Sequence, residues 1–479
     1  MNILKSFVLC SSMLLTLAVK AQTPSEVYDK PLCEVLEKVE QRYDVKITYD
    51  EKKINPETVV TSADWKFSFI GIDVTLDNIL KPLNLAYKKE GERNYSLISY
   101  EYFRKKHLEG EAHLNELKKI SSNLTDWEKR KSIVRESIMK NIGLSPMPQK
   151  TPLNPKVTNK RRYDGYTVEN IYLEVLPGVY TCGSLYKPSD INKKSKLAAM
   201  LSPHGHFYNK IDKSIPNERG RYRADQQYRC AMLARMGVIV FSYDMFAWGE
   251  STLQVPLKEH RTGLAPTMQT LNGMRILDYF FTLPYVDQTK VGITGASGGG
   301  TQAFLLAALD ERITLSVPTV MVSSHFYGGC PCESGMPIHE IDNAISTNNA
   351  EIAALCAPHP QLVISDGNDW TSSVPTLEYP YLKHIYSLYG EESKVQNTHL
   401  GEEGHDYGPS KRIAMYGFVA QNFGLDDSLI KDKKGQYDES KVNIEPAENM
   451  YAFGKERILP KGAVIGSDAV RKALEEAKK

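Results

Sequence analysis

The sequence predicts an α/β fold with a doubly wound, mostly parallel sheet, because buried strands alternate with helices along its middle. Residues 237–244 form an apolar run, typical of a parallel strand covered on both faces. A second apolar run at 291–294 leads through a glycine-rich turn into a helix expected at 301–309. A third run at 360–365 enters a turn rich in Gly, Asn and Asp. Ligands bind at such strand ends in open α/β sheets.

The turn after the second strand has the sequence Gly-Ala-Ser-Gly-Gly at 295–299. This pattern is typical of a nucleophile elbow, in which a serine stands at the apex of a strand–turn–helix unit. Glycines flank the serine because its backbone is strained and a neighbouring Cβ would collide with the adjacent strand or helix. Ser297 is therefore the candidate nucleophile, and a structural glycine-rich turn is the alternative.

A serine nucleophile of this type is followed along the chain by an acid and then by a histidine base. Asp369 lies beyond the third strand and its turn, where the acid is expected. Asp366, at the end of that strand, and the more distant Glu378 are alternatives.

His405 is the expected general base, because it lies in a loop ahead of an amphipathic helix at 412–420. A ring in that position can reach the elbow, take the serine proton and return it to the leaving alcohol. His399 is expected to end the preceding strand instead.

The negative charge of a tetrahedral intermediate requires an oxyanion hole, in which each backbone amide contributes roughly 3 kcal/mol. The amide of Gly298 is one expected donor. The other is expected from Gly205 or His206, in the His-Gly-His sequence after the apolar run 197–201. His204 and His206 as metal ligands are the alternative, although such a pair lacks a third ligand.

Composition and the N-terminus indicate an exported globular protein. Of 479 residues 41% are hydrophobic, and 59 Lys and Arg against 58 Asp and Glu give a net charge of +1. This balance offers no global electrostatic basis for binding nucleic acid. Residues 1–21 combine an early lysine, an apolar core and small residues before a cleavage site expected near Gln22, which indicates a signal peptide. A soluble periplasmic or secreted protein is expected.

No cofactor or metal is expected. The cysteines beyond the signal are even in number, which permits disulfides in an oxidising compartment: Cys33, Cys182, Cys230, Cys330, Cys332 and Cys356. A zinc site at Cys330 and Cys332, with His325 and His339 nearby, is the alternative, but its spacing matches no common structural pattern.

Residues 22–100 are expected to form a separate small β-α-β domain without catalytic residues. A helix burying Leu32, Val35, Leu36 and Val39 is followed by strands at 45–49 and near 67–69, a helix at 76–83 and a hairpin at 85–98. The sequence at 74–87 resembles the STN domain, the N-terminal module of secretins and TonB-dependent systems. This resemblance implies docking to a protein partner in the periplasm.

The rest of the chain divides into a charged helical linker at 101–140, a catalytic domain at 141–430 and a polar extension at 431–479. Antiparallel strands at 166–175 and 180–185 are expected to open the catalytic domain.

Two side chains of the catalytic domain are candidates for substrate binding. Trp248, in the loop after the strand at 237–244, is a candidate sugar-stacking platform, with simple packing as the alternative. Arg235, together with Arg219, Arg221 and Arg223, is a candidate for binding sugar carboxylates, with a salt-bridged surface as the alternative.

Segments between Trp127 and Leu425 resemble secreted carbohydrate esterases of the α/β-hydrolase fold, a group that includes acetylxylan esterases and pectin methylesterases. They lie at 144–148, 161–166, 204–206, 295–299, 328–333, 367–371 and 404–407. The resemblance implies a serine esterase with Ser297, His405 and Asp369 as its triad. It also implies removal of acetyl or methyl esters from polysaccharides such as xylan or pectin. The alternatives are a prolyl-oligopeptidase-like peptidase and a periplasmic docking or signalling protein.

Overall fold

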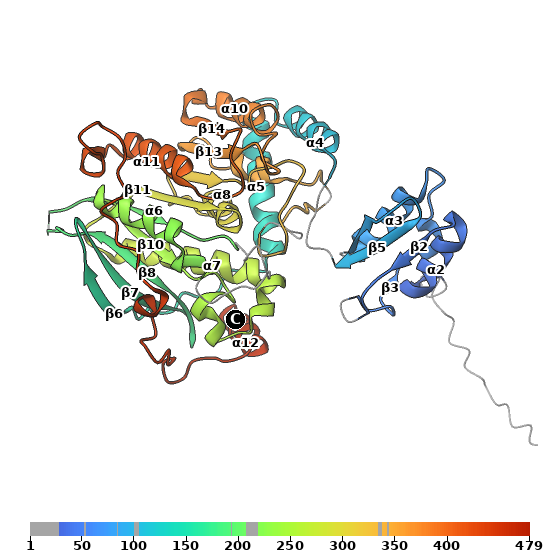
Figure 1. Ribbon diagram of the computed structural model, residues 1–479, viewed down its shortest axis with the longest axis horizontal. Coiled ribbons are helices and arrows are strands. Elements are labelled where there is room, and N and C mark those ends of the chain that lie inside the picture. The colour runs from blue at the N-terminus through green and yellow to red at the C-terminus, as the bar shows by residue number, and fades with distance from the viewer. Residues whose placement is uncertain are drawn as a thin grey trace, which may run out of the picture. The chain divides into compact units, whose positions relative to one another are not determined.

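The computed structural model describes residues 28–51, 54–83, 85–99, 105–192, 194–206, 219–333, 338–342 and 344–479 (Figure 1). The expected signal peptide lies outside them. The chain forms two compact units, Met1–Tyr100 and Glu101–Lys479. None of the helices in the described ranges combines the length and apolar character needed to cross a membrane.

The first unit is a small α/β domain around its own apolar core. Helix α2 (Leu32–Tyr43) buries the predicted residues Leu32, Val35, Leu36 and Val39. Strand β2 (Lys46–Thr48) pairs in parallel with β5 (Asn94–Ser99), which pairs antiparallel with β4 (Leu85–Lys89). Strand β1 (Lys30–Pro31) pairs with β3 (Val59–Val60), and α3 (Ile72–Leu80) completes the unit.

The strand expected near 67–69 is wrong. Residues 67–70 form a loop, and Phe69 is 96% exposed. The amide of Ser68 donates to the hydroxyl of Thr75 on α3 at 2.9 Å, so a helix side chain takes the bond that a strand partner would take. Apolar alternation alone does not make a strand where no neighbouring strand is available.

The second unit is built on a nine-stranded sheet with the order β14-β13-β12-β11-β9-β10-β8-β7-β6. Neighbours from β14 to β10 are parallel, whereas β8, β7 and β6 are antiparallel. The strands are β6 (Lys156–Arg162), β7 (Tyr166–Leu176), β8 (Val179–Pro188), β9 (Leu197–Leu201), β10 (Ile239–Tyr243), β11 (Val286–Ala296), β12 (Leu315–Thr319), β13 (Gln361–Asp366) and β14 (Val395–Leu400). The predicted doubly wound, mostly parallel sheet is confirmed.

Helices cover both faces of this sheet (Figure 1). Helices α6 (Ala224–Arg235) and α11 (Pro409–Phe423) pack on one face, where they share a core with Met200 and Val240. Helices α7 (Leu264–Thr282) and α8 (Gly298–Leu309) pack on the other face. Helix α9 (Asn349–Ala354) lies beside α8, and α10 (Glu378–Leu388) lies beside α9. This arrangement is the α/β-hydrolase architecture, with strand ends converging on one edge.

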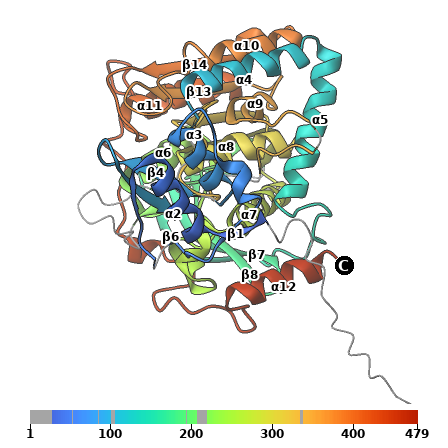
Figure 2. The same cartoon turned by 90° about the vertical axis from the view of Figure 1, so that its right-hand side faces the viewer.

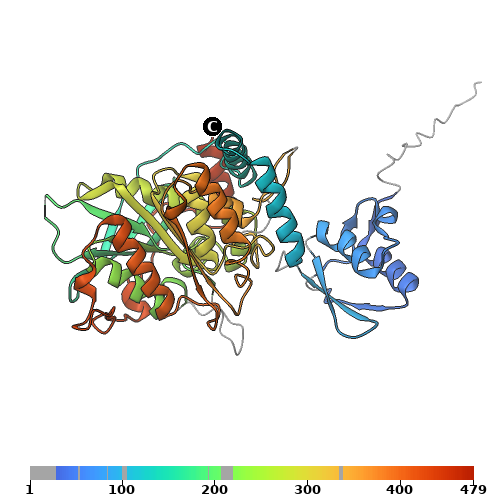
Figure 3. The same ribbon diagram turned by 90° about the horizontal axis from the view of Figure 1, so that it is seen from above.

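Helices α4 (His107–Ile120) and α5 (Leu124–Asn141) occupy the segment expected to be a linker. Figure 2 shows α4 beside α10, and Figure 3 shows the cyan α4 against the orange helices of the same unit. The guanidinium of Arg130 binds the buried carboxylate of Glu351 through two hydrogen bonds of 2.9 and 2.8 Å. These contacts make α4 and α5 part of the second unit rather than a linker.

Residues 431–479 also lie against the second unit. The ring of Phe453 stacks on Tyr172 of β7, with ring centres 4.7 Å apart. Helix α12 (Ser467–Ala477) buries Val470 and Leu474 in the main core. Although this segment is predominantly polar, a few apolar side chains therefore pack it against the rest of the unit.

Candidate active site

The turn between β11 and α8 holds Ser297 in the left-handed region, with φ 56° and ψ −124°. Its amide donates to the carbonyl of Thr319 on the neighbouring strand β12 at 3.1 Å, which fixes this conformation. A non-glycine residue adopts such a backbone at a cost of about 1–3 kcal/mol, and strain of this kind clusters at functional sites. The hydroxyl therefore stands at the carboxyl edge of the sheet, at the start of a helix.

The glycines around Ser297 are required by crowding. A Cβ at Gly295 would lie 2.5 Å from the carbonyl oxygen of Gly299, and one at Gly299 would lie 2.5 Å from that of Pro203. Both collisions involve backbone atoms, which cannot move aside as a flexible side chain can. The sharp turn and the close approach of the 203–206 loop thus depend on these two glycines.

The loops after β13 and β14 bring His405 and Asp369 together. His405 Nδ1 lies 2.7 Å from Asp369 Oδ2, and the other carboxylate oxygen accepts bonds of 2.5 Å from the amide and hydroxyl of Thr371. The Trp370 ring packs on the imidazole, with ring centres 4.4 Å apart. The imidazole is a quarter exposed, while the carboxylate is buried. An acid with both oxygens engaged holds the ring in one orientation.

The alternative acids and the alternative histidine have other partners. Asp366 pairs with Lys411 at 3.2 Å, and burial, followed by the charge of Asp369, raises the pKa of Asp366 to about 6. Glu378 accepts hydrogen bonds from the amide and hydroxyl of Ser324. His399 lies on β14, with its Nδ1 2.9 Å from the hydroxyl of Ser365.

Glu333, in the loop after β12, is a buried acid that the sequence analysis did not single out. Its Oε1 lies 3.2 Å from Ser297 Oγ and 2.7 Å from His206 Nδ1. Burial alone would raise the pKa of Glu333, but the charge and hydrogen bond of His206 and the amide of Gly329 lower it to about 2. The carboxylate is therefore ionised beside the nucleophile. In the sequence, only its position in the segment 328–333, which resembles carbohydrate esterases, pointed to Glu333.

The two predicted oxyanion segments meet at the elbow. A Cβ at Gly298 would lie 3.7 Å from His206 Cε1, so the first turn of α8 touches the loop that carries Gly205 and His206. The side chain of His206 thus lies beside the N-terminus of α8, and the oxyanion hole formed by Gly298 and by Gly205 or His206 stays a prediction.

Neither Trp248 nor Arg235 offers an exposed side chain at the edge of the sheet that carries Ser297. Trp248 is 1% exposed and packs against the rings of His204, His206 and His260, so its faces are covered and the stacking prediction is not supported. Arg235 ends α6 just before β10 begins, at the opposite edge of the sheet, and binds the carbonyl of Asp164. It serves packing there, not substrate binding.

Cys330 and Cys332 form a disulfide, with Cα atoms 5.2 Å apart. The histidines expected near them have different partners: His325 lies beside Ser323, and His339 beside Asn349. His325 and His339 therefore do not form a zinc site with Cys330 and Cys332.

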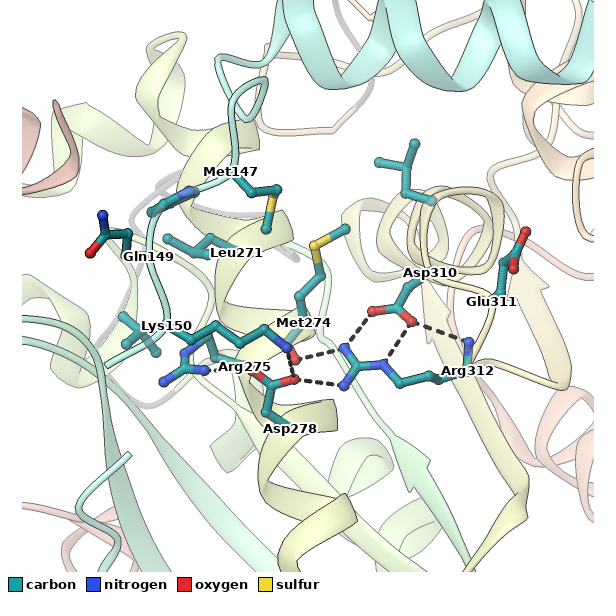
Figure 4. Close-up of a pocket in the computed structure, with 13 residues that line it drawn as sticks. Met147, Gln149, Lys150, Leu271, Met274, Arg275, Asp278, Asp310, Glu311 and Arg312 are labelled. Carbon is teal, nitrogen blue, oxygen red and sulfur yellow. Dashed lines mark hydrogen bonds and ion pairs between the residues drawn. The ribbon is translucent and has the colours of Figure 1, made fainter. Parts of the chain in front are cut away.

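A separate pocket of about 380 Å³ lies between α7 and the end of α8 (Figure 4). Its charges balance, because Lys150, Arg275 and Arg312 share the pocket with Asp278, Asp310 and Glu311. All three cations contact Asp278, and Arg312 also contacts Asp310. The pocket is lined by Leu309 at the far end of α8 from Ser297, about 18 Å along the helix. It is remote from the candidate active site.

No protein-family model and no curated protein sequence matches this chain. Among solved structures, Methylesterase BT1017 is 41% identical, with a TM-score of 0.75, over 95% of this chain and 99% of that chain. A putative acetyl xylan esterase from Bacteroides fragilis is 18% identical over 58% of this chain and 76% of its own, with a TM-score of 0.44. A glucuronoyl esterase from Solibacter usitatus is 16% identical over 63% and 94%, with a TM-score of 0.46. The identity to the first, over nearly the full length of both chains, shows that this protein belongs to the family of α/β-hydrolase esterases that includes Methylesterase BT1017.

Proposed function

We propose that this protein is a serine esterase that removes methyl esters from the uronic acids of plant-type polysaccharides such as pectin, with Ser297, His405 and Asp369 as its catalytic triad. The observation that carries the proposal is the 41% identity to a methylesterase over 95% of the chain. The strained Ser297 and the His405–Asp369 pair, on adjoining loops at one edge of the sheet, support the serine mechanism. The export signal expected at 1–21 fits a substrate outside the cytoplasm.

In the proposed reaction, Ser297 Oγ attacks the carbonyl carbon of the ester while His405 takes the hydroxyl proton. Asp369 holds the Nδ1–H of His405 and stabilises the imidazolium. The amide of Gly298 and an amide of the 205–206 segment bind the oxyanion. Collapse of the intermediate breaks the bond to the methoxy oxygen, and His405 protonates the departing methanol. Water then attacks the acyl-enzyme with His405 as base, which releases the uronate and restores the hydroxyl.

An acetyl esterase and a methylesterase share this chemistry and differ in which side of the ester the protein grips. A uronate methylesterase keeps hold of the uronic acyl group, and neighbouring sugars of its substrate carry carboxylates. Cations beside the site therefore favour binding of a methylesterase substrate. Arg221 is fully buried and paired with Asp244 and Glu250, which excludes it from this role. Arg223 is paired with Asp225 at 2.7 Å. Arg219 precedes Gly220, where a Cβ would lie 2.9 Å from His204. We assign the binding of substrate carboxylates to Arg219.

Product analysis tests the proposal directly. The purified protein and its Ser297→Ala variant are incubated with methylated pectin and with acetylated xylan, and methanol and acetate are measured. Methanol from the wild type alone is the expected result. Acetate without methanol would make the protein an acetyl esterase, and equal release by Ser297→Ala would exclude the serine mechanism.

A further inference from the structure

Four side chains from three separate loops converge beside the active-site serine. His206 follows β9, His260 lies in the 3-10 turn Leu257–Arg261, and Cys330 and Cys332 follow β12. All four are buried, between 2% and 8% exposed. His206 Nε2 lies 2.7 Å from His260 Nε2, 3.2 Å from Cys332 Sγ and 3.7 Å from Cys330 Sγ. The donor atoms of His206, His260 and Cys332 all lie within 4.8 Å of one another, and Cys330 Sγ approaches the same nitrogen of His206.

Hydrogen bonds at the opposite ring nitrogens determine what the two imidazoles present to each other. His260 Nδ1 lies 2.6 Å from the carbonyl oxygen of Phe246, and His206 Nδ1 lies 2.7 Å from the carboxylate of Glu333. Both partners are acceptors, so each Nδ1 carries a proton and donates it. The two Nε2 atoms then face each other at 2.7 Å. A carboxylate or carbonyl behind the histidine is typical of metal ligation.

The distances resemble those of a tetrahedral metal site. With Zn–N bonds of about 2.0 Å and Zn–S bonds of about 2.3 Å, neighbouring nitrogen and sulfur ligands lie about 3.5 Å apart and two nitrogens about 3.3 Å apart. The measured N–S distances of 3.2 and 3.7 Å bracket the first value. The two nitrogens need to separate by about 0.6 Å from their 2.7 Å distance. A space lined by His204, His206, His260 and Cys332 lies there, too narrow for a water molecule.

We propose that His206, His260, Cys330 and Cys332 bind one zinc-class divalent cation when the Cys330–Cys332 pair is in its dithiol state. From the disulfide, a dithiol reductant breaks the S–S bond, delivers two electrons and two protons to the sulfurs, and leaves as its own disulfide. The metal then displaces both thiol protons to solvent. Two histidines and two cysteines are a common ligand set for structural zinc. The histidines lie 124 residues or 70 residues before Cys330, so spacing in the sequence could not reveal the site.

A closed four-ligand site has no open position for substrate, so its role is structural. The ion would fasten the His206 loop, the His260 turn and the loop of Glu333 to one another. His206 borders Gly298, and Glu333 accepts bonds from both His206 and Ser297. Metal binding would therefore fix the segment assigned to the oxyanion hole. The ligand set itself is independent of which ester is cleaved.

Metal content and thiol state test the site without an activity assay. The full chain is purified without chelator, and its metal is measured by plasma mass spectrometry while alkylation and peptide mass spectrometry report Cys330 and Cys332. About one zinc ion per chain with both cysteines alkylatable is expected. Cobalt(II) in place of zinc should give the sulfur-to-cobalt charge-transfer absorption of a thiolate site. A chain without metal, whose two cysteines stay joined under a mild dithiol supplied with zinc, would overturn the proposal.

Variants separate this cluster from other cysteines. The double variant Cys330→Ser/Cys332→Ser should lose the metal and the cobalt absorption, whereas the control Cys33→Ser, in the first unit, should keep both. Thermal melting establishes that each variant is folded. Zinc retained by the double variant would exclude these ligands. The metal and thiol measurements on the wild type do not require that any variant folds. Their outcome is also independent of the product analysis, which tests the proposed esterase activity.

Discussion

The carboxylate of Glu333 accepts a hydrogen bond from the hydroxyl of Ser297 at 3.2 Å. The same oxygen lies 2.7 Å from His206 Nδ1, so one buried acid connects the nucleophile to the loop assigned to the oxyanion hole. Asp369 serves the other side of the site, where it orients His405. The two acids thus contact different histidines, and we expect Glu333 to position His206 and Ser297.

Replacement of Glu333 by Gln should lower kcat by roughly 10- to 100-fold, the range typical of losing a partner that orients a functional histidine. The amide keeps the shape but removes the negative charge that faces His206 Nδ1. KM should change much less than kcat, because Glu333 acts through other residues. Steady-state kinetics on methylated pectin checks this, with Glu311→Gln, at a side chain 81% exposed, as the control. An unchanged kcat would show that Glu333 has no positioning role in the reaction.

The Asp369→Asn substitution should reduce kcat by roughly 10⁴-fold, as loss of the orienting carboxylate does in serine proteases. Asp366→Asn is the matched control, because Asp366 lies three residues away but pairs with Lys411 rather than with His405. It should retain activity within about 10-fold. The opposite ranking of the two variants would make Asp366 the catalytic acid.

Arg219→Ala should raise KM for methylated polygalacturonate severalfold, because the cation that we assign to substrate carboxylates is lost. Turnover of an uncharged small ester should stay unchanged, since such a substrate carries no carboxylate. Arg162→Ala is the control, as its side chain is 66% exposed on the edge strand β6. Equal effects on the charged and uncharged substrates would exclude recognition of carboxylates.

Local patterns correctly predicted that Ser297, Asp369 and His405 each follow a strand, and the carboxyl ends of these strands lie at the same edge of the sheet. The catalytic roles of the three residues stay predictions. Glu333 was missed because its loop has no periodic pattern, and only the fold brings it to Ser297 across 36 positions. Trp248 shows a second limit, since an aromatic residue in a loop looks the same in sequence whether it faces inward or outward. Likewise, the charged composition around Arg130 suggested a linker, although Arg130 is buried against Glu351.

Gly299→Ala should destabilise the protein by more than the roughly 1–3 kcal/mol typical of overpacking, because its Cβ would lie 2.5 Å from a backbone oxygen. Gly263→Ala, where a Cβ meets nothing within 4 Å, is the matched control. Thermal unfolding of both variants measures the difference. A Gly299→Ala protein as stable as the control would mean that the 203–206 loop does not press on the elbow.

The raised pKa of Asp366 predicts a pH-dependent stability. In the folded protein, burial and then the charge of Asp369 raise this pKa to about 6, above roughly 3.9 in the unfolded chain. The folded state therefore binds the proton more tightly, and the destabilisation present above pH 6 disappears as the pH falls through 6 toward 4. Asp366→Asn does not titrate, so the melting temperature of the variant minus that of the wild type should decrease between pH 7.5 and 5.

The control for this titration is Asp190→Asn, at a carboxylate 92% exposed, for which the corresponding difference should stay constant over the same range. Ionic strength must be fixed, because salt screens exposed charges more than buried ones. A pH-independent difference for Asp366→Asn would mean that Lys411 neutralises the carboxylate fully. An increasing difference toward pH 5 would reverse the sign and show that Lys411 dominates both burial and the repulsion from Asp369.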